Sequence, residues 1–168
     1  MRDIEFRGKC SERYEELSYK ECSCGDWVFG SLVHQTDFYG IPVDRYYIID
    51  GTDTQDYDIG PAYRVDKETI GQYVGRKDKN GKKIYEGDIL VGKDCYSCWE
   101  GINNYYGEVR RFDEVCQFGI WVYKKPGSDA VGMFTGNIVD LDDWNSESWE
   151  VIGNVYDNPE LTFGGDNE

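Results

Sequence analysis

The sequence predicts a mainly β, α+β protein with a small SH3-like barrel at its centre. Three observations lead to this fold class: many short segments with the apolar-polar alternation of strands, turn signals at short intervals, and an Asn-Gly hairpin that leads through Glu-Gly-Asp into an apolar strand. Short strands separated by frequent turns are typical of small barrels and bent sheets. A β-sandwich is the alternative. With 168 residues, the chain forms one compact domain or two small subdomains.

Strand-like alternation runs along the whole chain. Residues 2–8 predict a half-buried strand with Ile4 and Phe6 facing inward, whereas the Glu-rich residues 11–21 predict a short helix or a loop. Asp66 is expected to cap a short helical turn. Further strands are predicted over residues 27–34, 45–50, 62–65, 72–74, 89–91, 107–112, 118–123, 131–134, 138–141 and 149–156.

Two glycine positions carry specific predictions. Gly30 interrupts an apolar strand, which indicates a bulge or a close approach of two backbones. Asn80-Gly81 can place two residues at positive φ and close a tight hairpin with the twist that strands prefer. This hairpin, residues 75–83, leads through residues 86–88 into a strand that begins near Ile89.

The chain is acidic, with a formal net charge of −15, and its acid lies at the two ends. Residues 1–60 hold 6 Lys and Arg against 13 Asp and Glu, and residues 126–168 hold none against 10. This charge opposes non-specific attraction to phosphate backbones and anionic lipid. The surplus acid either keeps a small protein soluble or forms an acidic face that docks on a basic partner.

The N-terminal residues and the cysteines indicate the compartment. No apolar run approaches the roughly 20 residues that span a bilayer, and residues 1–7 alternate charged and apolar side chains without a signal-peptide core. We therefore expect a cytoplasmic protein with no membrane partner. Its six cysteines are then expected to be reduced thiols and not a disulfide framework.

Three segments together resemble the YopX family: residues 1–9, residues 70–89 and residues 149–161, with Trp-Val-Phe-Gly at 27–30 and Gly-Glu-Val at 107–109 in the expected order between them. The resemblance runs from one end of the chain to the other. It implies a bacteriophage or prophage protein whose SH3-like β-barrel core carries an additional N-terminal α+β part. It implies no enzymatic activity, because the family has no assigned catalytic residues.

On this resemblance, the chain is one YopX-like domain with three parts. The N-terminal α+β part covers about residues 1–65, the barrel part covers residues 66–163, and residues 164–168 are a frayed tail. Four segments look expanded relative to the family pattern, and a function peculiar to this member is expected there. These segments are residues 10–25, 50–58, 93–106 and 140–147.

Four cysteines could supply the thiolates of a tetrahedral zinc site. Cys95 and Cys98 have a common ligand spacing, whereas Cys22 and Cys24 are separated by only one residue, which is less usual. The alternative is independent reduced cysteines, some of them partly buried. We expect no cofactor, with zinc as the alternative.

No catalytic constellation is evident in the sequence. His34 is the only histidine and is expected at a strand end; a Gly-rich loop with Lys-Ser/Thr and a Gly-x-Ser-x-Gly elbow are both absent. A cluster of carboxylates could bind a divalent cation, form an acidic face, or lie in a hydrated loop. Its members are Asp140, Asp142, Asp143 and Glu147.

One basic patch lies on the hairpin 75–83, and two tyrosines flank it. Small barrels bind single-stranded nucleic acid through basic loops and stacking aromatics, but a Lys-rich hairpin also protects an exposed sheet edge from aggregation. The candidate residues are Arg76, Lys77, Lys79, Lys82, Lys83, Tyr73 and Tyr85.

The sequence therefore favours a non-enzymatic accessory protein that binds a protein of the host or the phage, with a basic partner suiting its acidic ends. A nucleic-acid-binding barrel and a metal-dependent carboxylate enzyme are the alternatives. A homo-oligomer is compatible with each of them.

Overall fold

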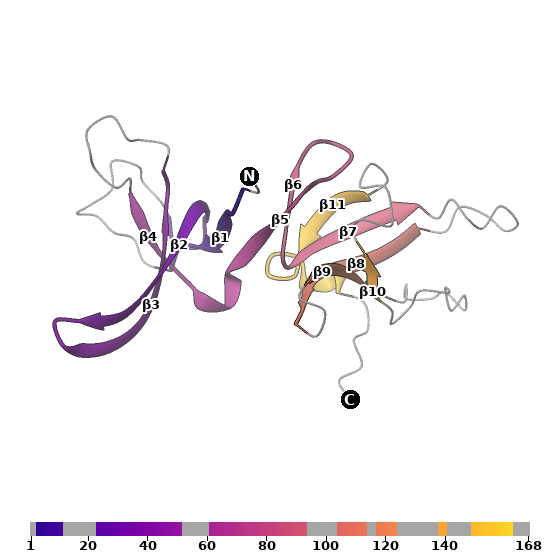
Figure 1. Ribbon diagram of the computed structural model, residues 1–168. Helices are drawn as coiled ribbons and strands as arrows, with labels where there is room; N and C mark the ends of the chain where they lie inside the picture. The colour runs from indigo at the N-terminus through magenta and orange to yellow at the C-terminus, as the bar shows by residue number, and fades with distance from the viewer. Residues whose placement is uncertain are drawn as a thin grey trace, which may run out of the picture. The chain divides into compact units, whose positions relative to one another are not determined.

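The structure is a computed structural model that describes residues 3–11, 23–51, 61–93, 104–113, 117–123, 138–140 and 149–162. These residues form two antiparallel sheets, which confirms the mainly β class (Figure 1). The chain divides into two compact units, unit 1 (Met1–Tyr73) and unit 2 (Val74–Glu168). Neither sheet closes into a barrel within the described residues, so the SH3-like barrel is not confirmed.

Unit 1 is a curled antiparallel sheet in which four strands pair in the order β4-β3-β2-β1. Its elements are β1 Phe6–Lys9, β2 Trp27–Phe38, β3 Ile41–Ile49, β4 Ala62–Val65 and the 3-10 helix η1 Lys67–Thr69. The strand β5, Gly71–Lys77, begins in unit 1 beside β1. A single bridge between Cys10 and Val65 brings the ends of β1 and β4 together, and no longer ladder between these strands follows it in the described residues.

One face of this sheet packs on the core of unit 1. The buried residues of this core are Val28, Ile48, Tyr63 and Val65, and Phe6, Leu32, Tyr46 and Ile70 pack against them. The inward position predicted for Phe6 is therefore confirmed, whereas that of Ile4 is wrong. Because β1 begins only at Phe6, Ile4 lies outside the ladder and is 70% exposed.

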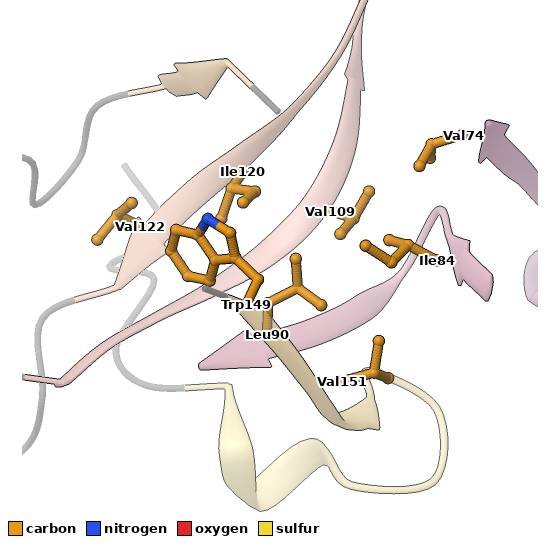
Figure 2. Close-up of a cluster of buried hydrophobic side chains, with 8 residues drawn as sticks. All are labelled: Val74, Ile84, Leu90, Val109, Ile120, Val122, Trp149 and Val151. Carbon is orange, nitrogen blue, oxygen red and sulfur yellow. The ribbon is translucent and has the colours of Figure 1, made fainter. Parts of the chain in front are cut away.

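Unit 2 contains a second antiparallel sheet with strand order β10-β9-β8-β7-β11. Its elements are β6 Lys83–Tyr85, β7 Asp88–Lys93, β8 Asn104–Phe112, β9 Gln117–Tyr123, β10 Ile138–Asp140, β11 Trp149–Asn154 and the 3-10 helix η3 Pro159–Leu161. Figure 2 shows the buried cluster beneath this sheet, in which Trp149 lies between aliphatic side chains. The other members are Val74, Ile84, Leu90, Val109, Ile120, Val122 and Val151.

The hairpin between β5 and β6 forms where the sequence predicts it, but with a different turn. Gly81 has a φ of +81°, whereas Asn80 does not adopt a positive φ. The Gly81 amide donates to the carbonyl of Asp78 at 2.9 Å, and the Asp78 amide donates to the carbonyl of Lys82 at 2.8 Å. The connection is thus a three-residue loop that ends in a glycine bulge, because one left-handed residue suffices there.

Several local predictions hold and others fall outside the described residues. The Asp66 carboxylate caps η1 by accepting a hydrogen bond from the Glu68 amide, as expected. Gly30 is confirmed as a close approach, since a Cβ there would overlap the carbonyl of Ile49. The segments 11–21 and 131–134 are not described beyond Ser11. Among the described residues, no helix is long and apolar enough to cross a bilayer.

Candidate interaction surface

A two-stranded arm extends from the sheet of unit 1. Among the described strands, β1 pairs with β2 only from Trp27 to Gly30, and β4 pairs with β3 only from Tyr46 to Ile49. Residues 35–45 therefore continue past both neighbours as the end of the β2–β3 hairpin (Figure 1), which we call the arm. A hairpin without further strands is marginally stable by itself, so its side chains are not there chiefly for packing.

The tip of the arm holds an aromatic residue in an unfavourable backbone conformation. Phe38 pairs with Ile41, and the two residues between them, Tyr39 and Gly40, have φ angles of +52° and +80°. Positive φ at both positions is a type I′ turn, in which Asn is normally favoured at the first position. Tyr39 is nonetheless 92% exposed. Neither packing nor backbone preference accounts for a tyrosine at this position.

The apolar residues Phe38 and Ile41 flank the turn. The Phe38 ring meets the Tyr39 ring edge to face, with centroids 4.7 Å apart, and Ile41 is 62% exposed. The guanidinium of Arg45 lies over the other aromatic ring, 5.6 Å from the centroid of Phe38. An apolar tip with an adjacent cation is typical of an anchor that inserts into a partner's pocket.

The strand register places several partly exposed apolar residues on one face, which we call the outer face. It is the face of the unit 1 sheet opposite the core, and it includes Phe29 and Val33. By strand alternation, its positions hold four cations and one carboxylate, Asp37, which follows Gln35 by two residues on β2. The outer-face positions are Arg7, Lys9, Trp27, Phe29, Ser31, Val33, Gln35, Asp37, Arg45, Tyr47, Ile49, Ala62 and Arg64.

The other acidic side chain of the arm, Asp44, lies on the opposite face with His34. The Asp44 carboxylate contacts His34 Nε2 at 2.7 Å and Lys67 Nζ at 3.2 Å. The hydrogen bonds with His34 and then Lys67 lower the pKa of Asp44, and the bond with Asp44 raises the pKa of Lys67. His34 therefore lies inside β2, stacked on Tyr46, and not at a strand end as predicted, because β2 continues to Phe38.

The basic hairpin predicted from the sequence is present, but its tyrosines do not line a surface. Tyr73 and Tyr85 are 8% and 4% exposed, so neither ring presents a face for stacking on a base. Lys79 forms an ion pair with Glu150, with Nζ and Oε2 2.6 Å apart. Arg76, Lys77 and Lys82 are exposed, whereas Lys83 is half-buried.

The other predicted candidates lie mostly outside the described residues. Cys24 is exposed, with its thiol 3.5 Å from the carbonyl of Ser11, while Cys22, Cys95 and Cys98 are not described. Asp140 ends β10 opposite Gly119, and Asp142, Asp143 and Glu147 are not described. Within the described part of the chain, no group of three or more His, Cys, Asp or Glu side chains is arranged to hold a metal ion.

Polar side chains in the segments that resemble the YopX family accept hydrogen bonds from backbone amides. The Asp88 carboxylate, 1% exposed, accepts a hydrogen bond from the Tyr85 amide at 2.8 Å. Asn154 Oδ1 accepts from the amides of Tyr156 and Asp157 at 3.0 and 2.9 Å. These side chains satisfy backbone donors in turns, which accounts for their presence by structure alone.

Sequence reasoning missed the tip of the arm. Tyr39-Gly40 lacks the Asn-Gly or Asp-Gly pair that signals a two-residue hairpin, and the predicted strands end at residue 34 and begin again at residue 45. The available signal was Gly40 between the apolar-rich segments 27–34 and 41–49.

A known protein family and a solved structure are similar to this chain. Among solved structures, protein EF1440 from Enterococcus faecalis is similar, with 23% sequence identity, a TM-score of 0.45, and coverage of 95% of this chain and 97% of that chain. No curated protein matches the chain. The family described as YopX protein matches residues 43–162, which is more than half of the sequence. The chain therefore belongs to the YopX family.

Proposed function

We propose that the chain is a non-enzymatic accessory protein that binds another protein through the tip of the arm. The observation that carries this proposal is Tyr39, an aromatic residue in a left-handed conformation and 92% exposed. Strained residues persist where function maintains them, and exposed aromatics are typical anchors of protein interfaces. The phage or prophage setting is the part of the proposal that the YopX resemblance implies, and the cytoplasmic compartment is the part that the sequence alone predicts.

The polar clusters also favour binding over catalysis. The side chains of Asp78, Asp88 and Asn154 accept hydrogen bonds from backbone amides. Asp44 lies in an exposed cluster on the opposite face of the arm. Each is explained by the fold without a substrate. An SH3-like arrangement of unit 2 remains part of the proposal, supported by Val74 and Ile84, which join its core from strands outside the five-stranded sheet.

Nucleic-acid binding through the hairpin 75–83 has less support. Its flanking tyrosines are buried, and Lys79 is paired with Glu150, so the patch offers isolated cations without a stacking platform. Dependence of oligonucleotide retention on Lys77 and Lys82 would favour this alternative.

The test is a comparison of two variants of the full chain. Tyr39→Asn suits the type I′ turn, so we expect the free energy of unfolding to stay equal or to rise by about 0.5–1 kcal/mol. The same variant is expected to lose a protein captured by the wild-type chain from host lysate. Lys82→Asn, at an exposed position in unit 2, is the matched control and should keep that protein.

Capture that is equal for the wild type and Tyr39→Asn contradicts a role for the arm tip. A captured second copy of the chain, seen as a dimer by light scattering that Tyr39→Asn converts to a monomer, identifies the partner as the protein itself.

A further inference from the structure

We propose that Asn80 is a site of spontaneous deamidation, and that the loop of the β5–β6 hairpin restrains this reaction through the hydrogen bonds of Asp78. The inference goes beyond the proposed function and is independent of it, because it concerns the hairpin and needs no partner protein. The modification adds a carboxylate at position 80 and cannot reverse by itself. It sets a slow limit on the lifetime of the native hairpin.

The chemistry uses two neighbouring groups of the chain and water. The backbone nitrogen of Gly81 loses its proton to solvent and attacks Cγ of Asn80, and the bond between Cγ and Nδ2 breaks. Nδ2 leaves as ammonia after it takes up a proton from solvent, so the proton balance of this step is zero. The product is a five-membered succinimide ring. Water then opens the ring at one of its two carbonyl groups, which gives aspartate or isoaspartate at position 80.

The sequence and the loop geometry make this position the reactive one. Asn80-Gly81 is the only Asn-Gly pair in the chain, and the Asn80 side chain is exposed to the water that the reaction needs. Among the described residues, no atom of another part of the chain lies within 4 Å of the ideal Cβ position of Gly81. Because glycine has no Cβ of its own, the approach of its nitrogen to Cγ of Asn80 is not hindered by a side chain.

The native loop opposes the reaction at the attacking nitrogen. The Gly81 amide donates a hydrogen bond to the carbonyl of Asp78 at 2.9 Å. The succinimide nitrogen carries no hydrogen, so ring closure removes this bond. The carboxylate of Asp78 also accepts from the amides of Asn80 and Lys82 at 2.8 and 2.9 Å, which fixes the backbone on both sides of Gly81. The reaction therefore proceeds from a locally opened loop, and the stability of the loop sets its rate.

The product weakens the same loop. Asp78 is 6% exposed, and its carboxylate also accepts from the Val151 amide of β11 at 3.1 Å. A new carboxylate two residues away repels this charge. Isoaspartate also lengthens the backbone by a carbon atom, which displaces Gly81 from the carbonyl of Asp78. We expect the contact between the hairpin and β11 to weaken as a result.

The test measures the deamidation rate of the full chain by mass spectrometry of the peptide that contains Asn80. We expect a rate at least about tenfold lower in native buffer than in denaturing urea, with a ratio that matches the hydrogen-exchange protection of the Gly81 amide. Asp78→Ala should raise the rate in native buffer about tenfold or more, because the loop loses its charged acceptor. Asp113→Ala removes a carboxylate at an exposed position and is expected to leave the rate unchanged.

Asn80→Ser tests the consequence of the modification. It has no side-chain amide to lose, so its urea midpoint should stay constant during an incubation that lowers the midpoint of the wild type. An equal decline in the two chains contradicts the weakening of the loop by the product.

Equal rates in buffer and in urea overturn the inference, and so does a folded Asp78→Ala chain that reacts no faster than the wild type. If Asp78→Ala does not fold, the wild type alone decides. A native rate that departs from the protection of the Gly81 amide by more than about tenfold then shows that opening of the loop does not control the reaction.

Discussion

Asp78 shows how a single residue in an apparently functional patch can be structural. It is the one carboxylate among the basic residues of the hairpin 75–83. Its side chain is 6% exposed, and its carboxylate accepts hydrogen bonds from the amides of Asn80, Lys82 and Val151 at 2.8, 2.9 and 3.1 Å. The contact with Val151 joins positions 73 residues apart, which no local sequence pattern could reveal.

We predict that Asp78→Asn lowers the free energy of unfolding by about 1.5–3 kcal/mol at pH 7. The substitution replaces one carboxylate oxygen with an NH2 group, which cannot accept a hydrogen bond from the backbone amide that faces it, and it removes the negative charge from the other acceptor. Burial raises the pKa of Asp78, but the amides of Val151, Lys82 and Asn80 outweigh burial and lower it overall. A folded-state pKa below the unfolded one gives stability that is present above the unfolded pKa and lost as the pH falls through the folded pKa.

The difference between wild type and Asp78→Asn should therefore shrink as the pH is lowered from 7 through the range below 4. Urea denaturation at several pH values measures it. Asp113→Asn is the control, since Asp113 pairs with Arg111 at an exposed position, and it should change stability by no more than about 0.5 kcal/mol. A gap between wild type and Asp78→Asn that persists unchanged in acid would contradict the charged-acceptor argument.

Elements whose signals are local were predictable from the sequence. The β5–β6 hairpin follows from Asn80-Gly81, and η1 follows from the capping Asp66, because both depend on residues within one turn. The arm was not predictable to the same extent. Its strands were placed, but Tyr39 at positive φ contradicts the usual turn preference, so its tip and its two faces become visible only with the register of β2 and β3.

The turn after β11 provides a prediction about a family motif. A Cβ on Gly153 would overlap Asn158 Oδ1, the atom that accepts a hydrogen bond from the Asn154 amide, and would lie 3.1 Å from Leu161 Cδ1. We expect Gly153→Ala to lower the free energy of unfolding by about 1–3 kcal/mol through this crowding.

Chemical denaturation measures this loss, with Gly51→Ala as the matched control. Gly51 has no atom within 4 Å of its ideal Cβ position and no positive φ, so its substitution is expected to be nearly neutral. Equal effects at the two positions would show that Asn158 moves aside freely and that Gly153 is not required for packing.

Over the whole molecule, net charge says little about any one surface. The value of −15 is a sum over 168 residues, and it led to the prediction of a basic partner. The register of four strands brings Arg7, Lys9, Arg45 and Arg64 to one face of unit 1 together with the carboxylate Asp37, which a sum cannot show. The pattern of short strands in the sequence therefore predicted the class of fold, while the charge of a surface depends on which residues the sheet brings side by side.

The two units also differ in what stabilises them, because each has its own buried cluster. Ile48 is fully buried in unit 1 and Leu90 is fully buried in unit 2, and the two clusters share no described residue. Truncation of either side chain to Ala is expected to cost about 2–5 kcal/mol. We predict that Ile48→Ala accelerates amide exchange mainly in β2 and β3, and that Leu90→Ala does so mainly in β7 and β8. Hydrogen exchange followed by mass spectrometry measures this, and uniform acceleration across both units by either variant would show a single cooperative unit instead of two.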